Sequence, residues 1–291
     1  MTDFLQLLVS GMATGTTYAL AALGFTLLWQ ASGTINFAQG EFVMVPAFLM
    51  IFALSAGAPL WVAFLLACVG SLVLLGGLFK RSVVDPLRNH GVIGLVIATL
   101  GLGTGLKQLV KAGYSAEAHP FPNPFPDALL SVGSLKVSYA DVGTLLIALL
   151  IVGGLQLFLA RTLVGRAMQA CAQNTEAAAV LGIDVNRMVL YTFAINAVLS
   201  VVTALLITPT YLAKFDMGDV IGLKAFFAAI IGGFNSTNGA LLGGVLIGIL
   251  EGVTGHYVSA AYKEAAVLVL FLAVILFRPE GLLGKPVERK V

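Results

Sequence analysis

Charged residues are scarce in this chain, and so are cysteine and histidine. Lys, Arg, Asp and Glu make up 10% of the 291 residues, whereas 59% are hydrophobic, and there are only 2 cysteines and 3 histidines. Soluble domains carry about 25% charged residues, so this composition excludes an ordinary soluble fold. The net charge is only +2, and the basic residues lie between apolar runs and form no patch, which argues against nucleic-acid binding.

The motifs of soluble enzymes are also absent. The sequence contains no GxxxxGK[ST] phosphate loop, no CxxC or HExxH metal set and no GxSxG nucleophile elbow. Its histidines are scattered, and Cys68 and Cys171 are placed so that no disulfide is expected. We therefore expect no catalytic residue, metal or cofactor on this chain, and any energy source is an ion gradient or another chain.

Long apolar runs dominate what is present. They are continuous over about 17–25 residues, the length that a transmembrane helix needs, and they do not alternate as the strands of a membrane barrel do. We predict an all-α, polytopic transmembrane helical bundle of about eight or nine membrane segments, some of them broken or re-entrant. A single permease-like domain is expected over residues 1–291.

The orientation follows from basic residues in short loops. The 79–91 loop carries three, the 161–187 insert three and the C-terminal tail four. Such residues collect on the cytoplasmic side of a membrane. The pattern predicts a cytoplasmic insert and C-terminus, and it places the N-terminus and the 111–141 loop outside.

One polar interruption lies close to the N-terminus. Gln30–Glu41 reads QASGTINFAQGE without a single Lys or Arg, and the apolar run Phe42–Leu54 is too short to cross alone. We predict a broken span that holds Glu41 at membrane depth, where a carboxylate faces a cavity or a partner. The alternative is that Glu41 lies among headgroups and caps a helix beginning at Phe42.

A second break and two isolated charges lie nearer the C-terminus. Asn235, Thr237 and Asn238 form either the wall of a pathway or an ordinary loop. We interpret Lys224 as a snorkelling side chain and Glu251 as a residue near the outer interface. Glycines repeat along the following span at small-xxx-small spacing and predict one smooth face for helix packing: Gly239, Gly243, Gly244, Gly248 and Gly252.

The 161–187 insert is polar, favours helix and lies between two apolar runs. Within it, Glu176, Ala177 and Ala178 are followed by Gly182, an EAA-x-x-x-G pattern. The alanines make a thin helix that a groove on another protein accepts, and the glycine ends it. An amphipathic helix lying on the membrane surface is the alternative interpretation of this spacing.

Three stretches and the insert resemble one known family. The EAA-xxx-G insert looks like the coupling motif of ABC importer permeases. The run INFAQGEF at 35–42, IGGFNSTNGALLGGVLIGILEG at 231–252 and FRPEGLLG at 277–284 resemble the branched-chain amino acid permeases of the LivH type. Gln39 stands where that family commonly has histidine.

The resemblance implies a subunit of a bacterial ATP-driven importer in the cytoplasmic membrane. It implies a second, LivM-like permease, two cytosolic LivG/LivF-like ATPases that bind ATP and Mg, and an extracytoplasmic solute-binding protein. Glu176–Gly182 would couple to the ATPase, while Asn36, Gln39, Gly40 and Glu41 would lie on the translocation path. Two alternatives stay open: an ion-coupled secondary transporter in which Glu41 carries the proton, and a channel-like or structural subunit.

Overall fold

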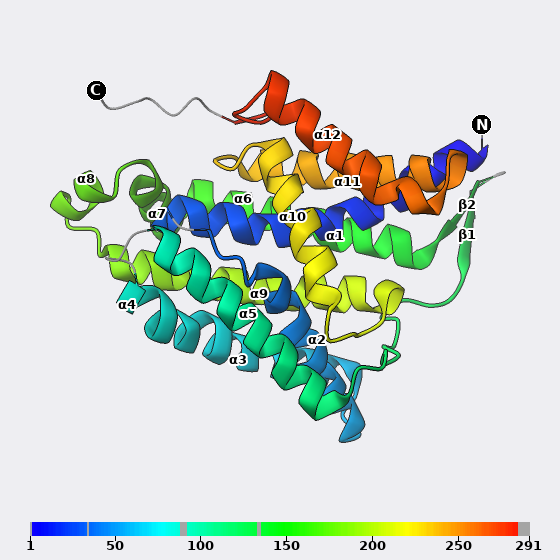
Figure 1. Ribbon diagram of the computed structural model, residues 1–291, viewed down its shortest axis with the longest axis horizontal. Coiled ribbons are helices and arrows are strands. Elements are labelled where there is room, and N and C mark those ends of the chain that lie inside the picture. Colours follow the sequence, from blue (N-terminus) through cyan, green and yellow to red (C-terminus); the bar gives the residue numbers. More distant parts are fainter. Residues whose placement is uncertain (1, 34, 88–91, 133–134, 285–291) are drawn as a thin grey trace. The chain divides into compact units, whose positions relative to one another are not determined.

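The computed structural model describes residues 2–33, 35–87, 92–132 and 135–284 (Figure 1). Arg88, His90 and the last basic residues of the tail lie outside these ranges. The long helices are α1 (Thr2–Ser32), α2 (Gln39–Ser55), α3 (Leu60–Ser71), α5 (Val92–Tyr114), α6 (Tyr139–Arg161), α7 (Leu163–Gln173), α9 (Val185–Tyr211), α10 (Met217–Gly232), α11 (Thr237–Tyr257) and α12 (Lys263–Phe277). Short helical elements are η1 (Leu72–Leu78), η2 (Lys80–Val84), α4 (Asp85–Leu87), α8 (Thr175–Val180) and η4 (Ala260–Tyr262).

Within the described ranges, seven helical stretches are long and apolar enough to cross a membrane. They are Asp3–Ala31, Leu60–Leu87, Ile93–Tyr114, Tyr139–Arg161, Val185–Tyr211, Thr237–Tyr257 and Ala260–Phe277. The apolar helices α2 and α10 are shorter, with 17 and 16 residues. At 1.5 Å per residue each reaches about 25 Å, which is less than the hydrocarbon core of a bilayer. The polytopic helical bundle is confirmed, while the count of eight or nine membrane segments stays a prediction.

The chain divides into two compact units, which are described separately. Unit 1 contains Met1–Thr26, Phe125–Val152 and Lys224–Val291, and unit 2 contains Leu27–Pro124 and Gly153–Leu223. The division falls within α1, α6 and α10, so each of these helices contributes residues to both units.

Backbone contact between helices organises unit 1. A Cβ atom added at Gly15 of α1 would lie 2.6 Å from the carbonyl oxygen of Gly244, and one added at Gly11 would lie 2.9 Å from that of Gly248. Small residues allow this close approach, which contributes van der Waals packing that lipid cannot supply. Of the other predicted packing glycines, Gly239 and Gly243 lie against the backbone of α10, and Gly252 lies beside Leu7.

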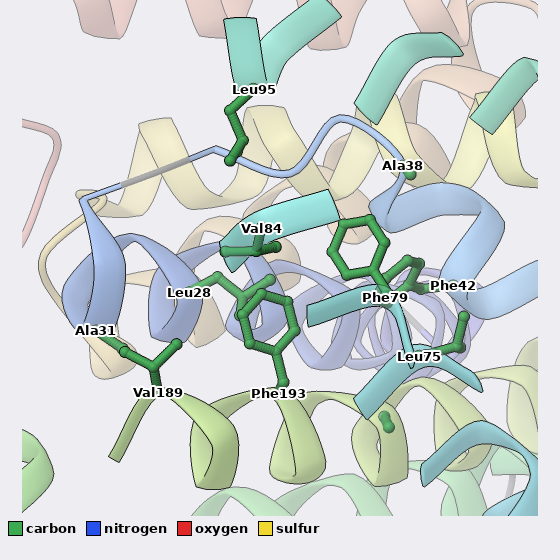
Figure 2. Close-up of a cluster of buried hydrophobic side chains, with 11 residues drawn as sticks. Leu28, Ala31, Ala38, Phe42, Leu75, Phe79, Val84, Leu95, Val189 and Phe193 are labelled. Atoms are coloured by element: carbon green, nitrogen blue, oxygen red, sulfur yellow. The ribbon is translucent and has the colours of Figure 1, made fainter. Parts of the chain in front are cut away.

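Unit 2 is built around α2, which packs against α3, α5 and α9. Its apolar core joins the last turns of α1 to α2, η1, η2, α5 and α9 (Figure 2). Three aromatic rings stand at its centre. The Phe42 and Phe79 centroids are 4.9 Å apart at 84°, and those of Phe79 and Phe193 are 5.7 Å apart. The first contact is edge-to-face and the second is tilted, and together they hold the three aromatic side chains against one another.

The 111–141 stretch is more ordered than the sequence suggested. The helix α5 continues to Tyr114, and strands β1 (Leu129–Val132) and β2 (Leu135–Ser138) pair antiparallel, with Leu130 opposite Val137 (Figure 1). Within unit 2, the backbone of His119 exchanges two hydrogen bonds of 2.9 and 3.0 Å with that of Ala213. Proline excluded a helix between these elements, but it did not exclude strands beside it.

Candidate functional site

A break in the helical backbone of unit 2 separates α1 from α2. Gly33 has a φ of +63°, a conformation that glycine adopts without strain. The Asn36 side-chain oxygen accepts a hydrogen bond of 3.0 Å from the Ala38 N–H, and the Thr99 hydroxyl accepts one of 3.2 Å from the Phe37 N–H. Side chains thus satisfy backbone groups that the missing helical turn leaves free, as irregular backbone inside a membrane protein requires.

An amide pair holds the first residue of α2. The Gln39 side-chain nitrogen donates to the Asn196 oxygen of α9 at 2.9 Å, and the Asn196 nitrogen donates back to the Gln39 oxygen at 2.9 Å. Both side chains are almost fully buried. Each amide satisfies the other, so removing one leaves a buried polar group without its partner, which is costly.

The first turns of α2 and α10 touch through their backbones. A Cβ added at Gly218 would lie 2.8 Å from the Gly40 carbonyl carbon and 2.9 Å from the Glu41 nitrogen. One added at Gly222 would lie 3.0 Å from the Gly40 Cα. Two discontinuous helices therefore begin side by side, with their amino ends at the same place. Such an arrangement surrounds solute sites in other transporters.

Glu41 lies in the first turn of α2, because that helix begins at Gln39. A helix that begins at Phe42 is therefore wrong, whereas the position of Glu41 relative to the headgroups stays a prediction. Its side chain is 6% exposed, and the carboxylate lies on the bare backbone of α5, where a Cβ at Gly103 would be 3.0 Å from Oε2. One turn further along α5, the Lys107 Nζ lies 2.7 Å from both Asp219 oxygens.

A different charged group occupies unit 1. The Lys224 Nζ lies 2.7 Å from the Glu251 Oε1, and the Tyr18 hydroxyl donates to Oε2 at 2.9 Å. Lys224 also donates to the Tyr18 oxygen at 3.3 Å. All three side chains are buried. The interpretation of Lys224 as a snorkelling side chain is wrong, because its ammonium group is buried against Glu251. The position of Glu251 near the outer interface stays a prediction.

The second set of predicted path residues lies in a different unit from Glu41. Asn235, Thr237 and Asn238 belong to unit 1. Ser236 caps α11 by accepting from the Gly239 N–H at 3.0 Å. The tail packs against the preceding turn, where the Leu282 N–H donates to the Ile231 carbonyl at 2.8 Å. Whether Asn235, Thr237 and Asn238 line a pathway or form an ordinary loop stays an open prediction.

The 161–187 insert contains the helices α7 and α8, both in unit 2. Asn174 caps α8 by accepting from the N–H groups of Glu176 and Ala177, and Gly182, with a φ of +84°, follows its end. Ala178 faces inward, whereas Val180 and Leu181 are 88% and 79% exposed. Burial in α7 raises the pKa of the Cys171 thiol, which stays protonated at neutral pH. Thus α7 is packed against unit 2, and α8 presents apolar side chains outward.

Comparison with known proteins identifies the family. The family model described as "Branched-chain amino acid transport system / permease component" matches residues 7–277. This chain belongs to that permease family.

Individual relatives agree over nearly the whole length. The permease is 32% identical to the high-affinity branched-chain amino acid transport system permease protein BraD of Pseudomonas aeruginosa, with 99% of this chain and 98% of the relative covered. It is 31% identical to LivH of Escherichia coli over the same shares. Together with the seven apolar helices, these relatives show a multi-pass membrane protein that is a transport component.

Sequence reasoning missed several residues of the site in this permease. Lys107 is the clearest, because a lysine within an apolar span is itself a signal of function. Asp219, Gly103 and Asn196 carry no comparable signal, since each is ordinary in its local context. Among the described residues, no three His, Cys, Asp or Glu side chains are grouped so that they hold a metal ion.

Proposed function

We propose that this permease forms the translocation path of an ATP-driven importer for branched-chain amino acids or a related small amphipathic solute. Its partners are a second, LivM-like permease, two cytosolic LivG/LivF-like ATPases that bind ATP and Mg, and an extracytoplasmic solute-binding protein. Family membership and the names of the relatives support the solute class. The basic residues of the short loops support a cytoplasmic C-terminus and an outside N-terminus in a bacterial cytoplasmic membrane.

The observation that carries the ATPase partnership is the exposed apolar surface of α8. Val180 is the last residue of a helix of 6 residues and Leu181 is its C-cap, and both are large apolar side chains outside every apolar stretch that is long enough to span a membrane. Ala177 and Ala179 keep the same surface thin. A short helix of this kind fits a groove on a partner protein, and exposure of its apolar residues to water is unfavourable without one.

A direct route joins α8 to the break before α2. After Gly182, Asp184 caps α9 by accepting from the Arg187 N–H at 3.1 Å, so α9 begins within one turn of α8. Along α9, Phe193 packs on Phe79 in the apolar core (Figure 2). Asn196 of the same helix pairs with Gln39. In our proposal, a displacement of α8 by the ATPase moves α9 and, through these two contacts, the first turn of α2.

The test is a charge placed on the exposed surface of α8. Val180→Glu and Leu181→Glu put carboxylates where the partner's groove is expected, and because both sites are exposed, folding should be preserved. We expect loss of ATPase copurification and at least a tenfold fall in ATP-dependent leucine uptake. Gln173→Glu is the matched control, because it adds the same charge at an exposed position of the same insert. Normal ATPase binding by both α8 variants would contradict the coupling role.

A further inference from the structure

The charges around Glu41 do not balance. Two carboxylates, Glu41 and Asp219, belong to the first turns of α2 and α10, and one ammonium group, that of Lys107, accompanies them. Lys107 is in contact with Asp219, and it acts on Glu41 only at longer range. Among the described residues, no cationic side chain is in ion-pair contact with the Glu41 carboxylate. The set is therefore short of one positive charge.

The surroundings of Glu41 make that shortage informative. A carboxylate that is removed from water without a counter-ion is unfavourable. Proteins therefore retain such a buried carboxylate where it contacts a ligand or a partner. Gly103 leaves the α5 backbone bare beside the carboxylate, and any larger residue would place its Cβ within 3.0 Å of Oε2. The absence of a side chain at Gly103 thus leaves room for the Glu41 carboxylate to lie against α5.

The Lys107–Asp219 pair has the opposite character. The Asp219 side chain is 51% exposed and that of Lys107 is 21% exposed, so water reaches the pair although its distances are short. Ion pairs in contact with water contribute little stability, because water replaces either partner at small cost. An incoming carboxylate can therefore take the place of Asp219 on Lys107, while Asp219 stays in water. Glu41 and Lys107 then face a ligand as an anionic and a cationic group, beside the solvated carboxylate of Asp219.

We infer that Glu41 and Lys107 form a binding site for the two charged groups of a zwitterionic amino acid, Glu41 for the α-ammonium and Lys107 for the α-carboxylate. The inference rests on the proposed function, and it adds the residues that bind the ammonium and carboxylate groups of the solute. Asp219 is the resting partner of Lys107 and lends a second negative charge to the ammonium side. The solute's side chain makes no contact that the site depends on, so one site serves several amino acids.

The test uses the full permease complex with its ATPases in lipid nanodiscs, and photo-leucine as the probe. Photo-leucine carries its diazirine in the side chain and leaves both charged groups intact. We expect photolysis to label peptides from α2 and α5. Excess leucine should suppress the labelling, whereas 4-methylpentanoate, which lacks the ammonium group, should not. Equal suppression by 4-methylpentanoate would overturn the assignment.

Variants separate the two charged groups. Glu41→Gln should lower the labelling at least tenfold, while Glu117→Gln, a matched loss of charge at an exposed site, should leave it unchanged. Lys107→Gln should weaken competition by leucine at least tenfold but leave competition by leucinamide, which lacks the carboxylate, unaffected. Unchanged labelling in Glu41→Gln, or equal effects of Lys107→Gln on both competitors, contradicts the site.

Two further measurements keep the outcome decisive. Gly103→Ala retains the charge but pushes a methyl group against the carboxylate, so it should also reduce labelling and carries the test if Glu41→Gln fails to assemble. ATP-driven uptake by the wild-type complex is measured in parallel. No uptake by the wild type defeats the proposed function, whereas uptake with full labelling of the variants defeats only this inference. Loss of a pH dependence of uptake in Glu41→Gln, with labelling retained, would assign Glu41 a proton instead.

Discussion

The buried charges of unit 1 and those of unit 2 are arranged in opposite ways. In unit 1, Lys224 and Glu251 are in contact, the Tyr18 hydroxyl bonds to the same carboxylate, and the group is neutral as a whole. In unit 2, Glu41 is as deeply buried, but its nearest ammonium group is in contact with Asp219. A satisfied and neutral group ties helices together, whereas an unbalanced one has affinity left for a ligand.

This difference gives the two kinds of charge different consequences when they are removed. Taking one member from a matched pair leaves the other charge buried and unpaired, which costs more than the pair contributed. Taking away an unpaired carboxylate relieves a cost and leaves no new one. The comparison therefore separates stability from transport, and it is tested by measuring both on the same variants.

The largest effect is expected from Lys224→Met. This change strands the Glu251 carboxylate inside unit 1, and breaking a buried pair in this way costs about 3–5 kcal/mol. We expect little folded protein in detergent, as measured by unfolding in SDS and by size-exclusion chromatography. The double variant Lys224→Met, Glu251→Leu should recover most of the stability. A stable single variant would show that the pair does not hold the helices together.

A smaller effect is expected from Tyr18→Phe. The change removes the hydrogen bond that the hydroxyl donates to Glu251 and the longer one that it accepts from Lys224, and it leaves the ion pair in place. A hydrogen bond to a charged group contributes about 1.5–3 kcal/mol. The same unfolding measurement should show a partial shift. Tyr257, on α11 and 59% exposed, supplies the control, because Tyr257→Phe should leave the unfolding free energy unchanged. Equal stability of Tyr18→Phe and wild type would show that the Tyr18 hydroxyl does not stabilise the Lys224–Glu251 pair.

The smallest effect on stability is expected from Glu41→Gln. No ion pair is lost, and the amide oxygen still accepts the hydrogen bond from the backbone N–H of residue 41, so destabilisation should stay below about 1 kcal/mol. The unfolding midpoint of this variant should therefore match the wild type or exceed it, although we expect its transport to fail. A destabilisation as large as that of Lys224→Met would show that Glu41 is a structural charge after all.

Sequence reasoning reached part of the site, and the reason is local chemistry. Asn36, Gln39, Gly40 and Glu41 stood out because a polar run without basic residues interrupts apolar spans. The structure places Asn36 at the break before α2 and the other three in the first turn of that helix. Their partners did not stand out. Asn196 lies 157 residues from Gln39, and no local pattern links the two amides.

Glu251 and Lys224 are a second case in which local sequence does not reveal the partner of a polar side chain. Taken singly, a lysine and a glutamate within apolar helices suggest snorkelling or an interfacial position. Only the packing of α10 against α11, where Gly243 admits the backbone of Ala228, brings the two charges into contact. The error came from weighing each charge alone, since its meaning depends on a counter-ion that sequence distance conceals.

Composition and apolar run lengths alone determined the class of this protein, its helical spans and the position of the α8 insert, because these depend on hydropathy and helix propensity along the chain. Tertiary structure alone decided which charges are paired and which are not. The glycines at 40, 103, 218 and 222 let backbones approach until side chains from three helices meet. Which charges are paired depends on these contacts between helices, and a pattern along the sequence does not show which helices are in contact.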